Sequence, residues 1–166
     1  MSLKNVKICS MNVRGLGNEE KRRDVFNWLK KKNHAIYCLQ DIHVGDKNKT
    51  AFCKDWGSEV ILSAVSTESR GVAILFNENL DYKLLSVDRD DRGNLLVLEL
   101  ELQLEKLLLV VIYGPNSDNP VFHNDLKQRL LKFNDVPMII CGDWNLVLDY
   151  SVDTHGYIRE NNVKAK

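Results

Sequence analysis

The sequence has no surplus of charge of either sign. Its 166 residues include 23 Lys and Arg against 23 Asp and Glu, so the formal net charge at pH 7 is zero. Bulk charge therefore does not indicate a nucleic-acid partner, and binding of a nucleic acid would require a local basic patch. Hydrophobic residues at 44% and charged residues at 28% exclude a disordered or fibrous chain. The length predicts a single domain over residues 1–166.

Long apolar runs are also absent. The longest, LLLVVIY at 107–113, is too short to cross a bilayer, so we expect no membrane partner. The opening residues, MSLKNVKICS, lack the apolar stretch of a secretory signal. The four cysteines show no CxxC spacing, and three fall in strand-like runs, where cysteine is usually a small buried hydrophobe. We therefore expect a nuclear or cytoplasmic protein that is not secreted.

Hydrophobic periodicity predicts strands interrupted by two helices. Asn18 is the expected N-cap of a helix over 19–32, and Asn119 followed by Pro120 predicts the start of a second helix. The expected strands are 6–13, 35–41, 71–76, 82–87, 95–104, 107–113 and a last one that starts at 137. Glu105-Lys106 is interpreted as the turn before 107–113, and 88–93 as a hairpin loop. This pattern indicates an α/β sandwich with sheets inside and helices outside.

The first predicted helix carries many basic residues. Its apolar face is expected to contain Val25, Trp28, Leu29 and Lys32. The basic residues of the remaining surface are Lys21, Arg22, Arg23, Lys30 and Lys31. They could follow a phosphate backbone, but we interpret them as a solvated helix face.

Several predicted strands end on polar side chains. These are Asn12, Asp41, Tyr113 with Asn116, and Asp143 with Asn145. An Asp or Asn after a strand is most often a turn former, so each end alone is better explained structurally. Turn formation gives no reason for four apolar strands to share polar ends, so we expect these side chains to converge in one cleft. Extended backbone would point Asp143 and Asn145 the same way.

Such a set of oxygen-bearing side chains suits Mg²⁺ or Mn²⁺, and no His or Cys cluster indicates zinc. It fits metal-assisted hydrolysis of a phosphate ester.

Five segments, in this order, resemble the endonuclease/exonuclease/phosphatase superfamily. Within it they are most similar to the N-terminal endonuclease domain of LINE-type (non-LTR) retrotransposon polyproteins. The segments are SMNVRGL (10–16), CLQDIH (38–43), SRGVAILF (69–76), VVIYGPN (110–116) and IICGDWN (139–145). The resemblance implies a four-layered α/β sandwich of the DNase I-like type and divalent-metal-dependent nicking of a DNA phosphodiester. In such an element the nick exposes the 3′ hydroxyl that primes reverse transcription. A reverse transcriptase domain of the same polyprotein would be a partner if the reading frame continues.

The resemblance also implies roles for the polar strand ends. Asn12 would help to order the metal site, and Asp41 would be its principal carboxylate ligand. Asp143 would orient or deprotonate the attacking water, or supply the proton of the leaving group.

Four further residues would act on the substrate. Tyr113 would hydrogen-bond the scissile phosphate, and Asn116 would lie near the DNA backbone. Asn145 would stabilise the charge that develops on the phosphate oxygens. Arg70, which opens a strand in a matching segment, is a candidate for substrate binding.

Three departures from the family pattern are visible. Asp41 stands where the family usually has Glu, and Arg14 stands where apurinic/apyrimidinic endonucleases carry an acidic residue, which favours the retrotransposon branch. The Ser-Asp-His motif that supplies the family's general base is not found. Asp153-Thr154-His155 follows IICGDWN too closely and is interpreted as a polar loop. The other histidines, His34, His43 and His123, are interpreted as surface residues.

The missing motif predicts a domain that lacks its last strands and helices and its general base. The loss of a positioned base would lower the rate by about 10²- to 10⁴-fold. Two alternatives therefore stay open: a non-catalytic remnant of the domain, and a phosphatase of the same superfamily that would need a pocket for a small phosphoester.

Overall fold

The structure, a computed structural model, describes residues 6–65, 70–116, 119–133 and 135–146. The described residues divide into two compact units. The first holds those up to Tyr113 together with Val136–Asp143, and the second holds Gly114–Asp135 and those from Trp144 onward. Both sheets belong to the first unit.

The first sheet has the strand order β1-β2-β4-β3. Its strands are β1 (Ile8–Asn12), β2 (Ile36–Gln40), β3 (Val60–Ser63) and β4 (Val72–Phe76). β1 and β2 are parallel, with Asn12 opposite Gln40, because helix α1 (Glu19–Lys32) returns the chain between them. β4 is antiparallel to both β2 and β3.

The second sheet has the order β5-β6-β7-β8. Its strands are β5 (Lys83–Arg89), β6 (Leu95–Leu102), β7 (Glu105–Tyr113) and β8 (Met138–Asp143). β5, β6 and β7 are antiparallel, whereas β8 is parallel to β7 and pairs Asp143 with Tyr113. The turn between β6 and β7 lies at Gln103 and Leu104, both with positive φ, two residues earlier than predicted.

Helix α1 begins and ends as the sequence predicted, but it buries a different face. The Asn18 Oδ1 atom accepts a hydrogen bond from the Lys21 backbone N at 2.9 Å, which confirms the N-cap. The buried residues are Arg22, Phe26 and Leu29, whereas Trp28 is 47% exposed. The predicted apolar face was therefore wrong in part. The buried set follows the i, i+4, i+7 spacing, with an arginine occupying an interior position.

Helix α2 (Asp46–Trp56) and strand β3 were not predicted. α2 has no side-chain N-cap and buries only Phe52 and Trp56, so its sequence shows little helical periodicity. Both side chains pack edge-on against Phe26 of α1, with ring centroids 5.1 and 5.3 Å apart. Burying aromatic side chains of this kind contributes about 1.5–3 kcal/mol each, so tertiary packing stabilises a helix that local signals do not mark.

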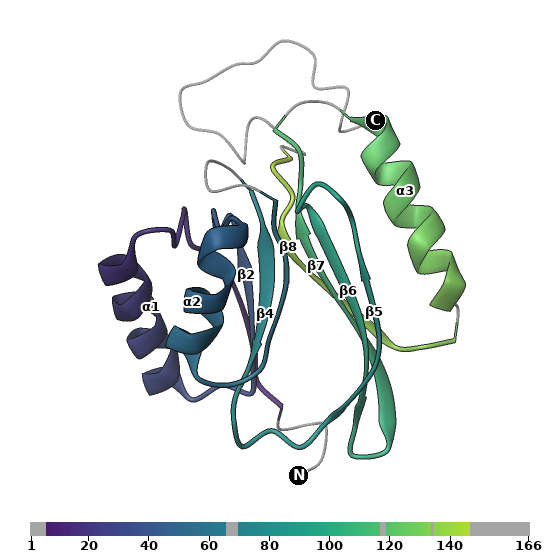
Figure 1. Ribbon diagram of the computed structural model, residues 1–166. Coiled ribbons are helices and arrows are strands. Elements are labelled where there is room, and N and C mark those ends of the chain that lie inside the picture. The colour runs from purple at the N-terminus through teal and green to yellow at the C-terminus, as the bar shows by residue number, and fades with distance from the viewer. Residues whose placement is uncertain (1–5, 66–69, 117–118, 134, 147–166) are drawn as a thin grey trace, which may run out of the picture. The chain divides into compact units, whose positions relative to one another are not determined.

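The side chains of β2 divide between two hydrophobic layers. Tyr37 and Leu39 pack with residues of α1 and α2, while Ile36 and Cys38 point to the other face and pack with residues of β6 and β7. This alternation is the period of two expected of a strand buried on both faces. The first unit therefore has three layers, with helices α1 and α2 on one face of the first sheet and the second sheet on the other (Figure 1).

Helix α3 (Pro120–Leu130) belongs to the second unit. The Asn119 Oδ1 atom accepts from the Phe122 backbone N at 3.1 Å, which confirms the predicted cap. Among the described residues, no helix is long and apolar enough to span a membrane.

Candidate active site

Polar strand ends from the two sheets meet in the first unit. Parallel pairing of β1 with β2 places Asn12 and the residue after β2, Asp41, at one end of the first sheet. Parallel pairing of β7 with β8 places Tyr113 and Asp143 side by side in the second sheet. The Asn12 Nδ2 atom donates a hydrogen bond to Asp143 Oδ2 at 2.9 Å. Two residues separated by 131 positions thus link the two sheets at this end.

Asp41 contacts a histidine that the sequence analysis placed on the surface. The His43 Nε2 atom lies 2.8 Å from Asp41 Oδ1, and the His43 side chain is only 29% exposed. Gly15 lies against the imidazole, since a Cβ added there would sit 3.2 Å from His43 Nδ1. His43 is therefore a partly buried neighbour of Asp41, and the surface interpretation was wrong in part.

The loops after β1 and β2 are joined by backbone hydrogen bonds. Gly15 N donates to Asp41 O, and Leu16 N donates to Ile42 O, both at 2.7 Å. On the other side, His43 N donates to Arg70 O at 2.9 Å. These bonds fix the position of Asp41 between the two neighbouring loops.

The backbone at this end contains several non-glycine residues in the left-handed region. The φ angles are 49° at Arg14, 59° at Asp41, 52° at His43 and 66° at Arg70. Each such residue costs about 1–2 kcal/mol. Conformations of this kind persist where the surrounding structure fixes them, and they cluster at functional sites.

A buried asparagine that the sequence analysis did not select joins two of the predicted residues. Asn94 contacts Tyr113 through its backbone and side chain, and its Oδ1 atom accepts from Arg70 Nη1 at 3.3 Å. The residue follows the predicted hairpin loop, 88–93, by one position. In the structure β5 continues to Arg89, so the loop before β6 spans residues 90–94. The only sequence feature that could have indicated Asn94 is its place as a polar residue directly before an apolar strand.

Asn116 and Asn145 belong to the second unit. Asn116 is exposed, and Asn145 Nδ2 donates to Gly114 O at 2.7 Å. β8 ends at Asp143 and Asn145 has a φ of 48°, so the extended backbone predicted from Asp143 to Asn145 was wrong. Trp144, between these two residues, is 37% exposed. The Asp153-Thr154-His155 segment lies outside the described residues.

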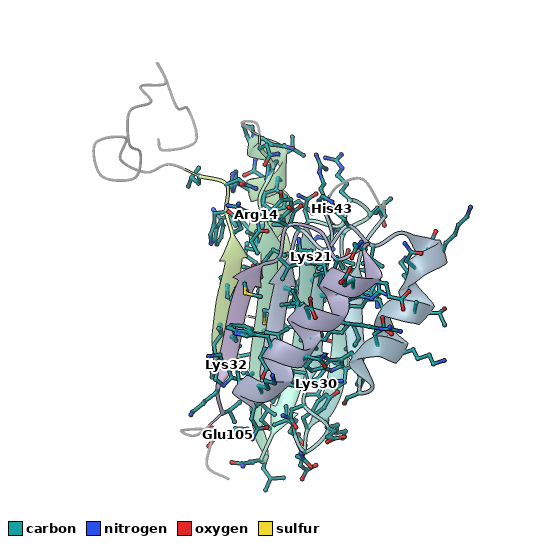
Figure 2. All side chains as sticks on the ribbon, turned by 90° about the vertical axis from the view of Figure 1, so that its left-hand side faces the viewer. Arg14, Lys21, Lys30, Lys32, His43 and Glu105 are labelled. Carbon is teal, nitrogen blue, oxygen red and sulfur yellow. The ribbon has the colours of Figure 1, made fainter. Side chains whose placement is uncertain are left out.

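The basic residues at the start of α1 are engaged within the protein. Lys21 Nζ donates to the carbonyl oxygens of Val13 and Arg14, at 3.0 and 2.6 Å. Arg22 is buried and forms an ion pair with Asp55 at 2.6 Å, so its assignment to a solvated face was wrong. Figure 2 shows Arg14, Lys21 and His43 at one end of the unit, and Lys30, Lys32 and Glu105 at the other.

The donor atoms present fit a hydrated magnesium ion better than a fully protein-bound metal. Asp41 Oδ1 is held by His43, and the described residues give Oδ2 no hydrogen-bond partner. Asn12 Oδ1 accepts from Arg14 N at 2.9 Å and has a second lone pair. Within the described residues, no group of three or more His, Cys, Asp and Glu side chains is arranged to hold a metal. Mg²⁺ is usually bound through one or two carboxylates and keeps several waters, so Asp41 and Asn12 fit it.

Two cysteine thiols, Cys38 and Cys141, interact close in the chain to Asp143. All four cysteines are free thiols, and Cys38 and Cys141 lie in the layer between the sheets. A hydrogen bond from Cys38 lowers the pKa of the Cys141 thiol, and the same bond, together with burial, raises the pKa of Cys38. The thiolate character is therefore concentrated on Cys141, two residues before Asp143.

Comparison with known proteins places this geometry in a family. The model of the Endonuclease/Exonuclease/phosphatase family matches residues 9–162. The chain belongs to this family. The match covers all of the predicted site residues in both units, and membership supports a nuclease-type hydrolase function.

Among the relatives of this family member is the Transposon TX1 uncharacterized 149 kDa protein of Xenopus laevis, 24% identical over 97% of the chain and 12% of its own length. An exodeoxyribonuclease of Bacillus subtilis (strain 168) is 25% identical over 85% of the chain and 59% of its own length. The structure of D. rerio TDP2 complexed with single strand DNA product has a TM-score of 0.61 at 20% identity, covering 87% of this chain and 62% of that one. The likeness confirms the predicted α/β sandwich. The chain spans less than two thirds of these proteins.

Proposed function

We propose that this chain is a divalent-metal-dependent DNA endonuclease of the LINE retrotransposon type, which nicks one phosphodiester bond. The observation that carries the proposal is the 2.9 Å hydrogen bond between Asn12 and Asp143, which brings a carboxylate of the second sheet to the polar end of the first. The transposon relative supports the retrotransposon type, and the DNA product held by a structural neighbour supports DNA as the substrate class.

Asp41 and Asn12 would hold Mg²⁺ or Mn²⁺ through a carboxylate and an amide oxygen. When bound, such an ion supplies positive charge that offsets the charge developing on the phosphate. The contact with His43 fixes one oxygen of Asp41, so the carboxylate has a defined direction before any ligand arrives.

The reaction is a hydrolysis. A water oxygen forms a bond to phosphorus, the bond from phosphorus to the 3′ oxygen breaks, and a proton from the water balances the one taken up by the leaving oxygen. The products are a 5′ phosphate and a 3′ hydroxyl. Asp143 would orient or deprotonate the water, or supply the proton of the leaving group, and the amide of Asn12 would hold its carboxylate in place.

The remaining residues would act on the phosphate and the DNA backbone. Tyr113 would donate a hydrogen bond to the scissile phosphate, and Asn145 would stabilise charge on its oxygens. Arg70 and Asn116 would contact neighbouring backbone phosphates. Arg70 is exposed at the same end as Asp41, as a phosphate contact requires.

A plasmid-nicking assay tests the proposal. Supercoiled plasmid should be converted to the open circle in Mg²⁺ or Mn²⁺, but not in EDTA, and Asp143→Ala should abolish the conversion. The exposed Asp81→Ala is the matched control and should nick as the wild type does. Failure of well-folded wild-type protein to nick with either metal would contradict the proposal.

A non-catalytic domain that binds DNA is the second candidate. Such a protein would bind duplex DNA without nicking it. A phosphatase for small phosphoesters would need a pocket at the polar strand ends, whereas a cavity of about 240 Å³ lies at the opposite end of the first sheet, beside Tyr37, Phe76 and Asn77.

A further inference from the structure

Resting on the proposed function, we propose that Asn94 is a positioning residue that holds the phosphate-contacting Tyr113 and the DNA-contacting Arg70 in one fixed arrangement. None of the five short segments on which the sequence resemblance rests contains Asn94. It precedes β6 directly and is 98% buried, with a relative exposure of 2%.

Asn94 holds both backbone polar groups of Tyr113. Tyr113 N donates to Asn94 O at 2.8 Å, and Asn94 Nδ2 donates to Tyr113 O at 2.5 Å. Tyr113 is the last residue of β7, and the ladder between β6 and β7 ends at the pair Leu95 and Ile112. The side-chain amide therefore adds a backbone constraint at the point where the sheet ladder stops.

The same amide reaches the loop before β4. Its Oδ1 atom accepts from Arg70 Nη1 at 3.3 Å. Arg70 precedes the first sheet's β4, whereas Tyr113 closes β7 of the second sheet. One planar amide thus uses its donor on Tyr113 and its acceptor on Arg70, and sets their relative position across the two sheets.

The backbone of Asn94 is itself held in place by Asp90. Its backbone N donates to Asp90 Oδ1 at 2.9 Å, and Leu95 N donates to the same oxygen at 3.0 Å. Ser63 Oγ in turn donates to Asp90 O at 3.1 Å. A donor or acceptor left unpaired in such a buried place costs about 1–3 kcal/mol, so the amide has no low-energy alternative to its present partners.

Three substitutions separate the contact of the Asn94 amide with Tyr113 from its contact with Arg70. Asn94→Asp keeps an acceptor for Arg70 but sets a carboxylate oxygen against the Tyr113 carbonyl, so kcat should fall by about 10- to 100-fold while KM changes little. Arg70→Leu should raise KM and leave kcat nearly unchanged, because a backbone contact is lost but Tyr113 stays in place. Asn94→Ala should change both parameters.

The position of Tyr113 is measured independently of activity by ¹⁹F NMR on protein carrying 3-fluorotyrosine. The Tyr113 signal is assigned with Tyr113→Phe. Asn94→Ala and Asn94→Asp should shift or broaden it, whereas Asn77→Ala, a loss of an asparagine at the opposite end of β4, should not. If Asn94→Ala does not fold, Asn94→Ser takes its place in the experiment.

An unmoved Tyr113 signal in folded Asn94 variants would overturn the positioning role, whether or not the wild type nicks. Nicking parameters of Asn94→Asp equal to those of the wild type would overturn it as well. A wild type that does not nick, combined with a shifted Tyr113 signal, would refute the proposed function and leave the positioning of Tyr113 by Asn94 supported.

Discussion

At the scale of single residues, the contact between Asp41 and His43 shows which site features a short sequence segment predicts and which it does not. Asp41 was predicted as a site residue from its place after an apolar strand. His43 was not, because side chains two positions apart meet here only through local backbone geometry. Both residues have positive φ, at 59° and 52°, and no hydrophobic pattern indicates such a turn. The sequence therefore predicted a role for the carboxylate but did not predict the histidine that contacts it.

Replacing His43 should weaken metal binding. A hydrogen-bonded neighbour orients a ligating carboxylate, and its loss typically lowers metal affinity by about 10- to 100-fold. We expect His43→Ala to weaken Mn²⁺ binding by this amount in a titration followed by electron paramagnetic resonance. His43→Gln, which keeps a donor, should retain part of the affinity, and His123→Ala in α3 should retain all of it. Equal Mn²⁺ affinities of His43→Ala and wild type would remove His43 from the site.

At the scale of elements, prediction succeeded where local signals and tertiary structure agree. α1 and α3 have side-chain caps at Asn18 and Asn119, and both helices begin where these caps predicted. The unbroken apolar run of β7 is buried throughout from Leu107 to Ile112, as expected. α2 was missed because it lacks a cap and is stabilised through two aromatic contacts with another helix. Such contacts depend on the final packing, so no local pattern contains them.

Strand β8 depends on a glycine next to the candidate catalytic carboxylate. Gly142 has a φ of 142°, and a Cβ there would overlap the carbonyl oxygen of Ile112 on β7. Gly142→Ala should lower the free energy of unfolding by more than the roughly 1 kcal/mol of a left-handed alanine alone. Gly57→Ala is the control, because Gly57 also has positive φ but its Cβ would meet nothing closer than 3.9 Å. Urea denaturation of both variants measures the difference, and equal losses would contradict the overlap.

The thiol pair between β2 and β8 predicts unequal reactivity. Because the bond from Cys38 lowers the pKa of Cys141, a larger thiolate fraction exists on Cys141 at neutral pH, and iodoacetamide should label it before Cys38. Cys38→Ala removes the donor, so the pKa of Cys141 should rise and its labelling at pH 7.5 should slow. Peptide mass spectrometry follows both sites, with Cys53→Ala as the control. Faster labelling in Cys38→Ala would mean that accessibility, and not the hydrogen bond, governs Cys141.

At the scale of the whole molecule, the charge balance limits how DNA can be held. The net charge is zero, and the basic residues at the start of α1 are committed to Asp55, Glu19 and backbone carbonyls. Lys30 and Lys32 lie at the opposite end from Arg14 (Figure 2), with their ammonium groups 5.3 and 4.9 Å from the Trp56 and Trp28 rings. Arg14 and Arg70 are exposed cations of the loops that border Asp41: Arg14 follows Asn12 by two residues, and the backbone O of Arg70 accepts from His43 N.

This charge distribution predicts a shallow salt dependence of DNA binding. Each phosphate contact contributes about −0.9 to the slope of log K against log salt concentration, so two contacts give a slope of about −2. Fluorescence anisotropy with a labelled duplex in EDTA measures the slope without cleavage. Arg14→Ala should reduce its magnitude by about 1, whereas Lys30→Ala should leave it unchanged, because that side chain lies at the far end of the unit (Figure 2). A slope near −6, or one that responds to Lys30→Ala, would place the DNA along α1 and away from the strand ends.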